Sequence, residues 1–402
     1  MVNFNFSYDT NVSLEQRIGF EMAAAIWSSF LTDDIDVNLH IGATTGLDNG
    51  NAVGGAIPIF HEQTYGVFNE YYNNDVSSAA DQQAEGSLQS GNTVDLSVNG
   101  ELVNGNTKIL LTSAQAKALE MDEAITLDNG STWDRDLLNP NALDGYIVVN
   151  TSFDWNYDFA RADEASEGTL DFLSMALHEI GHNLGFVSGL DGTIDFETLH
   201  SGRNQVSDFT ALDLFRHTVD TAELENPDGS VSNVSIGGNA YFSIDGGATN
   251  LGDFSTGQNT EGGGDGYQAS HWKRLQDAMG IMDPTLAYKE RLNLSELDLQ
   301  AMDVLGYDIN YDVLDTGLDM SALLLQAEHA VATDLGLDSS LLTANRGDGN
   351  LYTMGYSQWW QIFEKQILEM GYSQWWQVFE MGYSLWWQTL EDKDAMIEKG
   401  DR

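Results

Sequence analysis

The sequence of 402 residues contains no cysteine, which excludes disulfides and every metal site built on thiolate ligands. A metal ion in this protein must therefore be held by histidine, aspartate or glutamate side chains.

Basic residues are scarce: 16 lysines and arginines stand against 63 aspartates and glutamates, for a formal net charge of −47. This charge repels nucleic-acid phosphate and anionic membrane surfaces, so we expect no nucleic-acid partner. The acidity has two open explanations, namely work in salt or among divalent cations, and plain solvation of the surface. A hydrophobic fraction of 42% indicates a globular chain rather than a disordered one.

Long apolar stretches are also missing: no run of about eighteen apolar residues occurs, so no transmembrane segment is expected. The opening residues, MVNFNFSYDTNVSLEQRIGF, lack the basic and apolar regions of a secretory signal. We nevertheless expect a secreted or extracellular protein; a cysteine-free composition is common in exported bacterial enzymes but does not by itself identify the compartment. Either a presequence has been trimmed or export follows another route.

Several segments of the first half carry clear secondary-structure patterns. Residues 14–31 space their apolar side chains as a helix does, and residues 35–42 alternate like a half-buried strand. Residues 46–130 are rich in glycine, asparagine and aspartate and predict short strands and loops. GYIVVNTSFDW at 145–155 predicts a strand, because tyrosine, isoleucine and two valines lie together.

A helix is expected at 167–185, where Gly185 would end it because glycine tolerates the left-handed backbone that closes a helix. A long insertion follows, with a predicted helix at 207–218 and a hairpin at 240–254. A last helix should follow Ser295, whose side chain suits an N-cap.

The C-terminal region contains an internal repeat, MGYSxWWQ, whose copies start at Met354, Met370 and Met381. The last two copies are eleven residues apart and keep nearly the same helical face, whereas the first step of sixteen rotates the face by roughly 160°. Six of the ten tryptophans lie in these copies, which suits docking to a surface, a glycan or a partner's groove. A recent duplication that packs weakly on its own domain remains the alternative.

HEIGH at residues 178–182 is the strongest chemical signal in the chain. Residues four apart share a helix face, so His178 and His182 can direct their imidazoles at one metal ion. Glu179, next to the first histidine, can reach water at that ion and act as the general base of a hydrolysis reaction. The competing interpretation is a chance pattern on a surface helix.

HEIGHNLGF extends this motif to HExxHxxGF, which resembles the metzincin branch of zinc metallopeptidases. In most metzincins a third zinc histidine lies three residues after the glycine, but here that position is Ser188. Two residues compete for the third place: Asp191, close in sequence, and His271, beyond the insertion. We favour His271, because GIMDPTLA follows it and resembles the metzincin methionine turn, with Met282 on a tight segment that Pro284 ends.

HExxHxxGF, a long insertion, SHW and IMDP, in that order, resemble leishmanolysin-type metallopeptidases, and most closely a bacterial group of them. DLFR, YFSIDGG and DVLGYDI are also similar, so the resemblance covers roughly residues 1–312. It implies three zinc ligands, a base and a turn methionine, namely His178, His182, His271, Glu179 and Met282. The chain departs from the family in having no cysteine, and in having no tyrosine two residues after Met282, so an astacin-like tyrosine switch is not expected.

The resemblance also implies an α/β (α+β) metzincin-like fold, in which a twisted mixed sheet covers an active-site helix and a lower subdomain follows that helix. The expected divisions are a catalytic domain at 1–312, a linker at 313–344 and a small helical repeat tail at 345–402. Within the catalytic domain, residues 1–185 would form the upper subdomain, and residues 186–312 the insertion and the lower subdomain.

The expected function is zinc-dependent endopeptidase activity on a protein or peptide that binds extended along an edge strand, with GYIVVNTS as a neighbour of the cleft. The rival is a non-catalytic surface or adhesion protein that keeps zinc for stability and acts through the tail repeats. Retention of Glu179 argues against the rival, because a structural zinc site has no use for a base.

The remaining histidines have no partner at ligand spacing and are interpreted as structural or surface residues; they are His40, His61, His200, His217 and His329. Two acidic glycine-rich loops, at 47–55 and 260–266, offer the oxygen ligands that calcium prefers. Neither matches a complete calcium-loop pattern, so plain turns are favoured and calcium is the alternative.

Overall fold

The computed structural model describes residues 1–47, 52–121, 125–126, 132–133, 142–161, 165–191, 206, 208–222 and 229–344. The chain divides into two compact units, Met1–Ala327 and Glu328–Arg402. The MGYSxWWQ repeats and His200 lie outside the described residues. The domain limits expected from the sequence stay a prediction.

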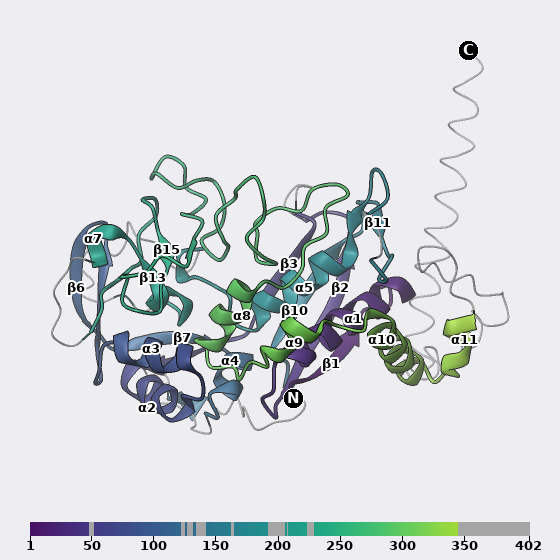
Figure 1. Cartoon of the computed structure of the whole chain (residues 1–402), viewed down its shortest axis with the longest axis horizontal. Helices are drawn as coiled ribbons and strands as arrows, with labels where there is room; N and C mark the ends of the chain where they lie inside the picture. The colour runs from purple at the N-terminus through teal and green to yellow at the C-terminus, as the bar shows by residue number, and fades with distance from the viewer. Residues whose placement is uncertain are drawn as a thin grey trace, which may run out of the picture. The chain divides into compact units, whose positions relative to one another are not determined.

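A four-stranded sheet forms the centre of the first unit (Figure 1). Its order is β1 (Asn3–Tyr8), β2 (Asp36–Thr44), β10 (Gly145–Asn150) and β3 (Gly54–Pro58). The first three strands run parallel, and β3 pairs antiparallel with β10. Among the described residues β3, like β1, is therefore an edge strand of this sheet, and its glycine-rich sequence, GGAIP, gave no strand signal.

Two helices pack against each other and against this sheet: α1 (Leu14–Phe30) and α5 (Phe172–Asn183) (Figure 1). Gly19 of α1 allows the close approach, since a Cβ there would lie 2.4 Å from the Phe172 ring. Trp27 of α1 is fully buried and its indole Nε1 donates to the Leu177 carbonyl at 3.1 Å. α5 is thus fixed along the face of the sheet.

Smaller sheets complete the β-structure of the described residues. β4 (Phe60–Thr64) pairs with β7 (Lys108–Thr112), and β5 (Val94–Val98) pairs with β6 (Glu101–Asn106) and β14 (Ser232–Asn233). The other pairings are β8 (Ile125–Thr126) with β9 (Thr132–Trp133), β11 (Trp155–Asn156) with β12 (Leu170–Asp171), and β15 (Tyr241–Phe242) with β13 (Arg216–His217) and β16 (Gly252–Asp253).

Short helices join these strands. Before α5 they are α2 (Tyr65–Asp75), α3 (Ala79–Ser87) and α4 (Ser113–Ala118); after it come η2 (Gly189–Asp191), η3 (Leu212–Phe215), α7 (Val219–Ala222), α8 (Glu296–Asp303), α9 (Asp312–Thr316), α10 (Met320–Leu335) and α11 (Ser339–Ala344). The molecule is therefore a mixed α/β protein with several small sheets. No helix among the described residues has the length and apolarity needed to cross a membrane.

Several local predictions are confirmed: α1, β2 and β10 lie where expected, β15 and β16 form the hairpin, and Ser295 caps α8. Residues 46–130, expected to be strands and loops, also contain the helices α2, α3 and α4, so that prediction is only partly correct. The helix expected at 207–218 is wrong, because the segment forms only η3 and then β13. Its buried Asp213 accepts backbone hydrogen bonds from Gly189 and Thr210, both at 2.9 Å. The conformation of this segment is therefore determined by contacts that include residues distant in sequence, and not by the helical spacing of its apolar residues. The expected helix at 167–185 begins only at Phe172, since Leu170–Asp171 pairs with β11.

Candidate metal centre

Helix α5 carries the first two histidines of the candidate centre, His178 and His182, one turn apart. The chain turns away immediately afterwards: Gly185 has φ +121°, in the left-handed region, and Phe186 N donates to the Gly181 carbonyl at 3.1 Å. Gly181 also lets Met282 approach the helix, because a Cβ at residue 181 would lie 2.6 Å from the Met282 sulfur.

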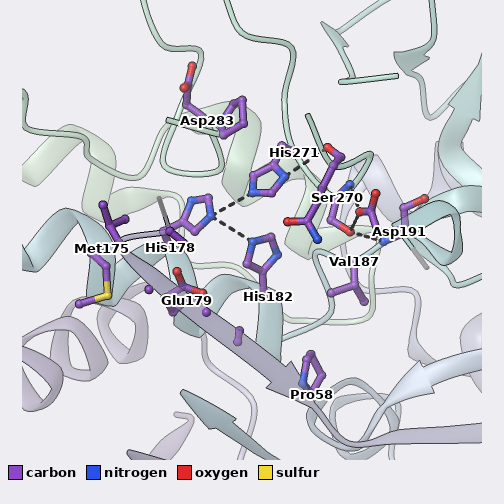
Figure 2. Close-up of a pocket in the computed structure, with 18 of the residues that line it drawn as sticks. Pro58, Met175, His178, Glu179, His182, Val187, Asp191, Ser270, His271 and Asp283 are labelled. Carbon is purple, nitrogen blue, oxygen red and sulfur yellow. Dashed lines mark hydrogen bonds between the residues drawn. The ribbon is translucent and has the colours of Figure 1, made fainter. Parts of the chain in front are cut away.

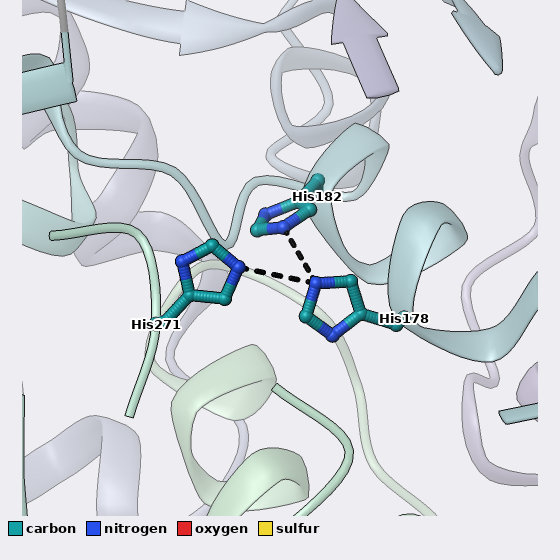
Figure 3. Close-up of side chains that lie close together, drawn as sticks. All are labelled: His178, His182 and His271. Atoms are coloured by element: carbon teal, nitrogen blue, oxygen red, sulfur yellow. Dashed lines mark hydrogen bonds between the residues drawn. The ribbon is translucent and has the colours of Figure 1, made fainter. Parts of the chain in front are cut away.

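The third imidazole comes from His271, in a segment without regular structure beyond the insertion (Figure 3). The Nε2 atom of His178 lies 3.2 Å from His271 Nε2 and 3.0 Å from His182 Nε2. All three residues can offer a ligand atom within 4.8 Å of the others, and no other such group of three occurs among the described residues. The three histidines are therefore close enough to bind one metal ion.

Each imidazole is oriented by a backbone carbonyl at its other nitrogen. The Nδ1 atoms of His178, His182 and His271 lie 2.8, 2.7 and 3.2 Å from the carbonyl oxygens of Ile281, Phe186 and Gln268. A carbonyl oxygen can only accept, so Nδ1 carries the proton and each Nε2 presents a lone pair. Three lone pairs converging within hydrogen-bond distance repel one another, and a cation at their centre removes that repulsion.

Burial favours the neutral form that a metal needs. It lowers the pKa of His178 to about 4 and that of His182 to about 3, where the nearby His178 adds to the effect. Burial lowers the pKa of His271 well below its usual range too. At neutral pH all three imidazoles are therefore uncharged and ready to act as ligands.

Glu179 lies beside the histidines, facing β3 (Figure 2). Its side chain is buried, and burial raises its pKa to about 8. Gly54 of β3 makes room for it, since a Cβ at residue 54 would lie 2.7 Å from Glu179 Oε1. A cation at the three histidines would favour the ionised carboxylate and offset some of this shift.

A cavity of about 620 Å³ opens over the three histidines and Glu179 (Figure 2). Its walls are residues 52–56 in and before β3, the segment 187–191 after α5, and residues 283–286 around Pro284. Among the described residues, its lining contains the carboxyl groups of Glu179, Asp191 and Asp283 and no lysine or arginine. β10 contributes no lining residue and lies one strand further in, so the GYIVVNTS strand as the cleft's neighbour is wrong, and β3 takes that place.

Asp191 does not join the group of metal-ligand atoms. Its carboxylate accepts hydrogen bonds from Ala269 N at 2.5 Å and Ser270 N at 2.7 Å, and from the Ser270 hydroxyl. Ser188 donates its hydroxyl to Asp213 at 2.6 Å. Of the two candidates for the third ligand, the structure brings His271 to the pair on α5.

Met282 is fully buried against α5, and Pro284 lines the cavity. Met282 O accepts from Trp272 N at 3.0 Å, which joins the turn to the residue that follows His271.

The structure adds residues that the sequence pattern did not single out, above all Gly54 and Asp298. Asp298 is completely buried and belongs to the capping box of α8, a local signal that could have marked it. Nothing in the sequence around Gly54 indicates its approach to Glu179, because that contact depends on how β3 lies against α5.

The other histidines that the structure describes have different surroundings. His61 is buried against the Ser113 hydroxyl at 2.6 Å, and His40 lies near Ser7 and Asp9. His217 is buried and His329 is exposed. The loop around 260–266 is closed by backbone hydrogen bonds such as Gly264 N to Asn259 O at 2.9 Å, whereas residues 48–51 of the other candidate calcium loop lie outside the described residues.

Comparison with known proteins adds no assignment: no family model, no curated protein and no solved structure matches this chain.

Proposed function

We propose that this chain is a zinc-dependent endopeptidase of the metzincin type that hydrolyses peptide bonds with Glu179 as general base. The observation that carries the proposal is the convergence of three neutral imidazoles beside a buried carboxylate, in a cavity with an open strand edge as one wall. Each component has a role in peptide hydrolysis.

The donor set fits zinc. His178, His182 and His271 would hold the ion through three neutral nitrogen donors, a ligand set typical of catalytic rather than structural zinc sites. Zinc held in this way lowers the pKa of water toward neutrality and polarises a carbonyl group. The backbone carbonyls at the three Nδ1 atoms fix the tautomer and the ring orientation that such binding requires.

Glu179 supplies the proton transfers. Its carboxylate takes a proton from the attacking water and returns it to the leaving amine, so it must be able to exist in both protonation states near neutral pH. Burial, which raises its pKa to about 8, moves the carboxyl toward that range. A purely structural metal site would gain nothing from a buried carboxylate at this position.

The edge of β3 gives the substrate its register. β3 bonds to β10 along one edge, and no further strand pairs with it among the described residues, although its residues line the cavity. An extended peptide that adds to this free edge satisfies backbone donors and acceptors on both sides. This placement brings a substrate carbonyl within reach of the histidine cluster and Glu179.

Metal analysis and peptide hydrolysis on matched variants test the proposal. Wild type should hold about one zinc per chain. Glu179→Gln should keep the zinc and lose about 10²- to 10⁴-fold in kcat. His271→Ala should lose the zinc and the activity together, while His40→Ala, outside the cluster, serves as the control. Wild-type protein that is folded and zinc-free after zinc loading, or a Glu179→Gln variant with full activity, would rule out this mechanism.

A further inference from the structure

His271 lies in a segment that has no helix or strand to hold it, although it must meet two histidines on a rigid helix. A ligand on a loose segment weakens metal binding, because ordering the segment costs conformational entropy at the moment of binding. The residues on both sides of His271 are, however, attached to two buried carboxylates from other regions of the chain.

Asp191 holds the residues immediately before His271. Its carboxylate accepts from the backbone amides of Ala269 and Ser270, at 2.5 and 2.7 Å, and from the Ser270 hydroxyl. The same Ser270 oxygen accepts from Ser188 N at 2.8 Å. The segment before His271 is thereby tied to the chain that leaves α5, directly after the other two histidines.

Asp298 of α8 holds the residues that follow His271. Its Oδ1 accepts from the Trp272 indole Nε1 at 2.7 Å, and its Oδ2 accepts from Ile281 N at 2.8 Å. The Ile281 carbonyl, in turn, accepts from Nδ1 of His178 at 2.8 Å. One carboxylate therefore connects the neighbour of His271 to the group that orients His178.

A helix cap alone does not explain Asp298. The capping box uses Oδ2, which accepts from Ser295 N at 2.8 Å and from the Ser295 hydroxyl at 2.7 Å. Oδ1 is directed at Trp272 and makes no contribution to the cap. Asp298 is also completely buried and forms no ion pair among the described residues, a costly arrangement that its hydrogen-bond donors offset.

We propose that Asp191 and Asp298 are positioning residues that hold His271 from both sides, and that metal affinity depends on them although neither binds the metal. The inference rests on the proposed function only in taking the three histidines as a metal site. Partners of this kind around metal ligands typically contribute about 10- to 100-fold to affinity or activity. We expect a loss of about that size from each carboxylate.

The test measures zinc affinity by chelator competition and the absorption spectrum of the Co²⁺-loaded full chain. Asp298→Asn and Asp191→Asn should each weaken zinc binding about 10- to 100-fold and alter the Co²⁺ spectrum at saturating metal. Trp272→Phe removes the indole donor to Asp298 Oδ1, keeps a single aromatic ring in the buried cluster with Phe186 and Phe254, and should shift both readouts in the same direction. This milder variant carries the test if Asp298→Asn does not fold.

Asp303→Asn is the matched control. Asp303 lies on the same helix as Asp298 and is equally buried. Its carboxylate accepts a hydrogen bond from the Tyr311 hydroxyl at 2.8 Å, whereas that of Asp298 accepts from Trp272, next to His271. Asp303→Asn should leave zinc affinity within about twofold of wild type. Equal zinc affinity in wild type, Asp298→Asn and Trp272→Phe overturns the positioning role while the metal site stands. Equal losses in the control also overturn it, and wild type that binds no zinc removes the proposed function and this inference together.

Discussion

Gly54 and Gly55 are neighbours on β3 with opposite surroundings. A Cβ at residue 54 would lie 2.7 Å from Glu179 Oε1 and 2.9 Å from the Met175 sulfur, whereas a Cβ at residue 55 would meet nothing within 4 Å. Neither glycine has a positive φ, so the difference is one of space rather than of backbone conformation. The absence of a side chain at residue 54 thus leaves the space that the Glu179 carboxylate occupies.

Gly54→Ala should therefore displace Glu179 and lower kcat/KM at least about tenfold, because a shift of about one ångström in a catalytic group has costs of that order or larger. Zinc content should remain that of wild type, since the histidines keep their partners. Gly55→Ala is the control and should retain activity. Peptide hydrolysis and metal analysis on the two variants decide the matter: equal activity in both would show that Glu179 has room to adapt.

At the residue scale, the sequence predicted the portion of the centre that depends on local spacing. His178, Glu179 and His182 follow from one helical turn, whereas His271 could be chosen over Asp191 only through a resemblance in the segment after it. Asp298 and Gly54 could not be predicted, because their roles depend on contacts with α5 and with the His271 segment that only the folded chain creates. Tertiary contacts of that kind leave no periodicity in the sequence.

The first unit contains a cluster of acidic side chains from the segment after α1 and from helices α2 and α8, in which the pKa values of three carboxyls are raised chiefly by burial. The pKa of Asp33 rises to about 6, and those of Asp75 and Asp303 to about 7, with neighbouring carboxylates adding to each shift. No salt bridge from lysine or arginine reaches these three among the described residues. The folded state therefore binds protons here more tightly than the unfolded chain does.

The contribution of these three carboxyls to stability should consequently fall as pH rises, in the opposite sense to that of the buried histidines, whose pKa values are lowered. Below about pH 4 these carboxyls are protonated in both states and add no penalty; between about pH 4 and pH 7 the unfolded chain releases its protons first, so unfolding becomes easier. Asp303→Asn should flatten this decline and raise the Tm at about pH 8 by a few degrees. Thermal melts of wild type and Asp303→Asn across about pH 4 to 8 check the sign, and a Tm difference between the two that does not grow with pH would contradict it.

At the scale of elements, local patterns predicted a helix correctly wherever an N-cap residue and amphipathic spacing indicate the same helix. The helix α1 begins with a capping box at Ser13 and buries its apolar face, and α8 begins with another at Ser295. The same reasoning predicted a helix at 207–218 that does not form. The apolar residues of this segment are buried in a core that includes β13 and β15, and they do not form one apolar face of a helix. β3 was missed because two glycines and a proline carry no strand propensity, and only pairing with β10 makes it a strand.

At the scale of the whole molecule, the net charge of −47 and the acidic lining of the cavity act in the same direction. Peptides with lysine flanks should be hydrolysed with kcat/KM about tenfold higher at low salt than matched peptides with glutamate flanks, since the field concentrates cations at the cavity. The difference should shrink as ionic strength rises and the charges are screened. Paired fluorogenic peptides assayed at two salt concentrations test this, and equal rates at low salt would contradict it.

Removing residues 345–402 distinguishes the endopeptidase from the adhesion protein. All the residues placed at the centre precede residue 300, so the shortened chain should keep its zinc and hydrolyse peptides within about twofold of the full chain. A protein that works through its tail repeats would instead lose its binding function and show no hydrolysis at either length. Activity assays on the two lengths give opposite results for the two interpretations.

The separation of 93 positions between His178 and His271 has a consequence for biosynthesis. A nascent chain carries only two of the three imidazoles until the segment around residue 271 has left the ribosome and the insertion has folded around it. The proposed zinc site can therefore be complete only after residue 271 has been translated, so the proposed hydrolytic activity cannot precede that point.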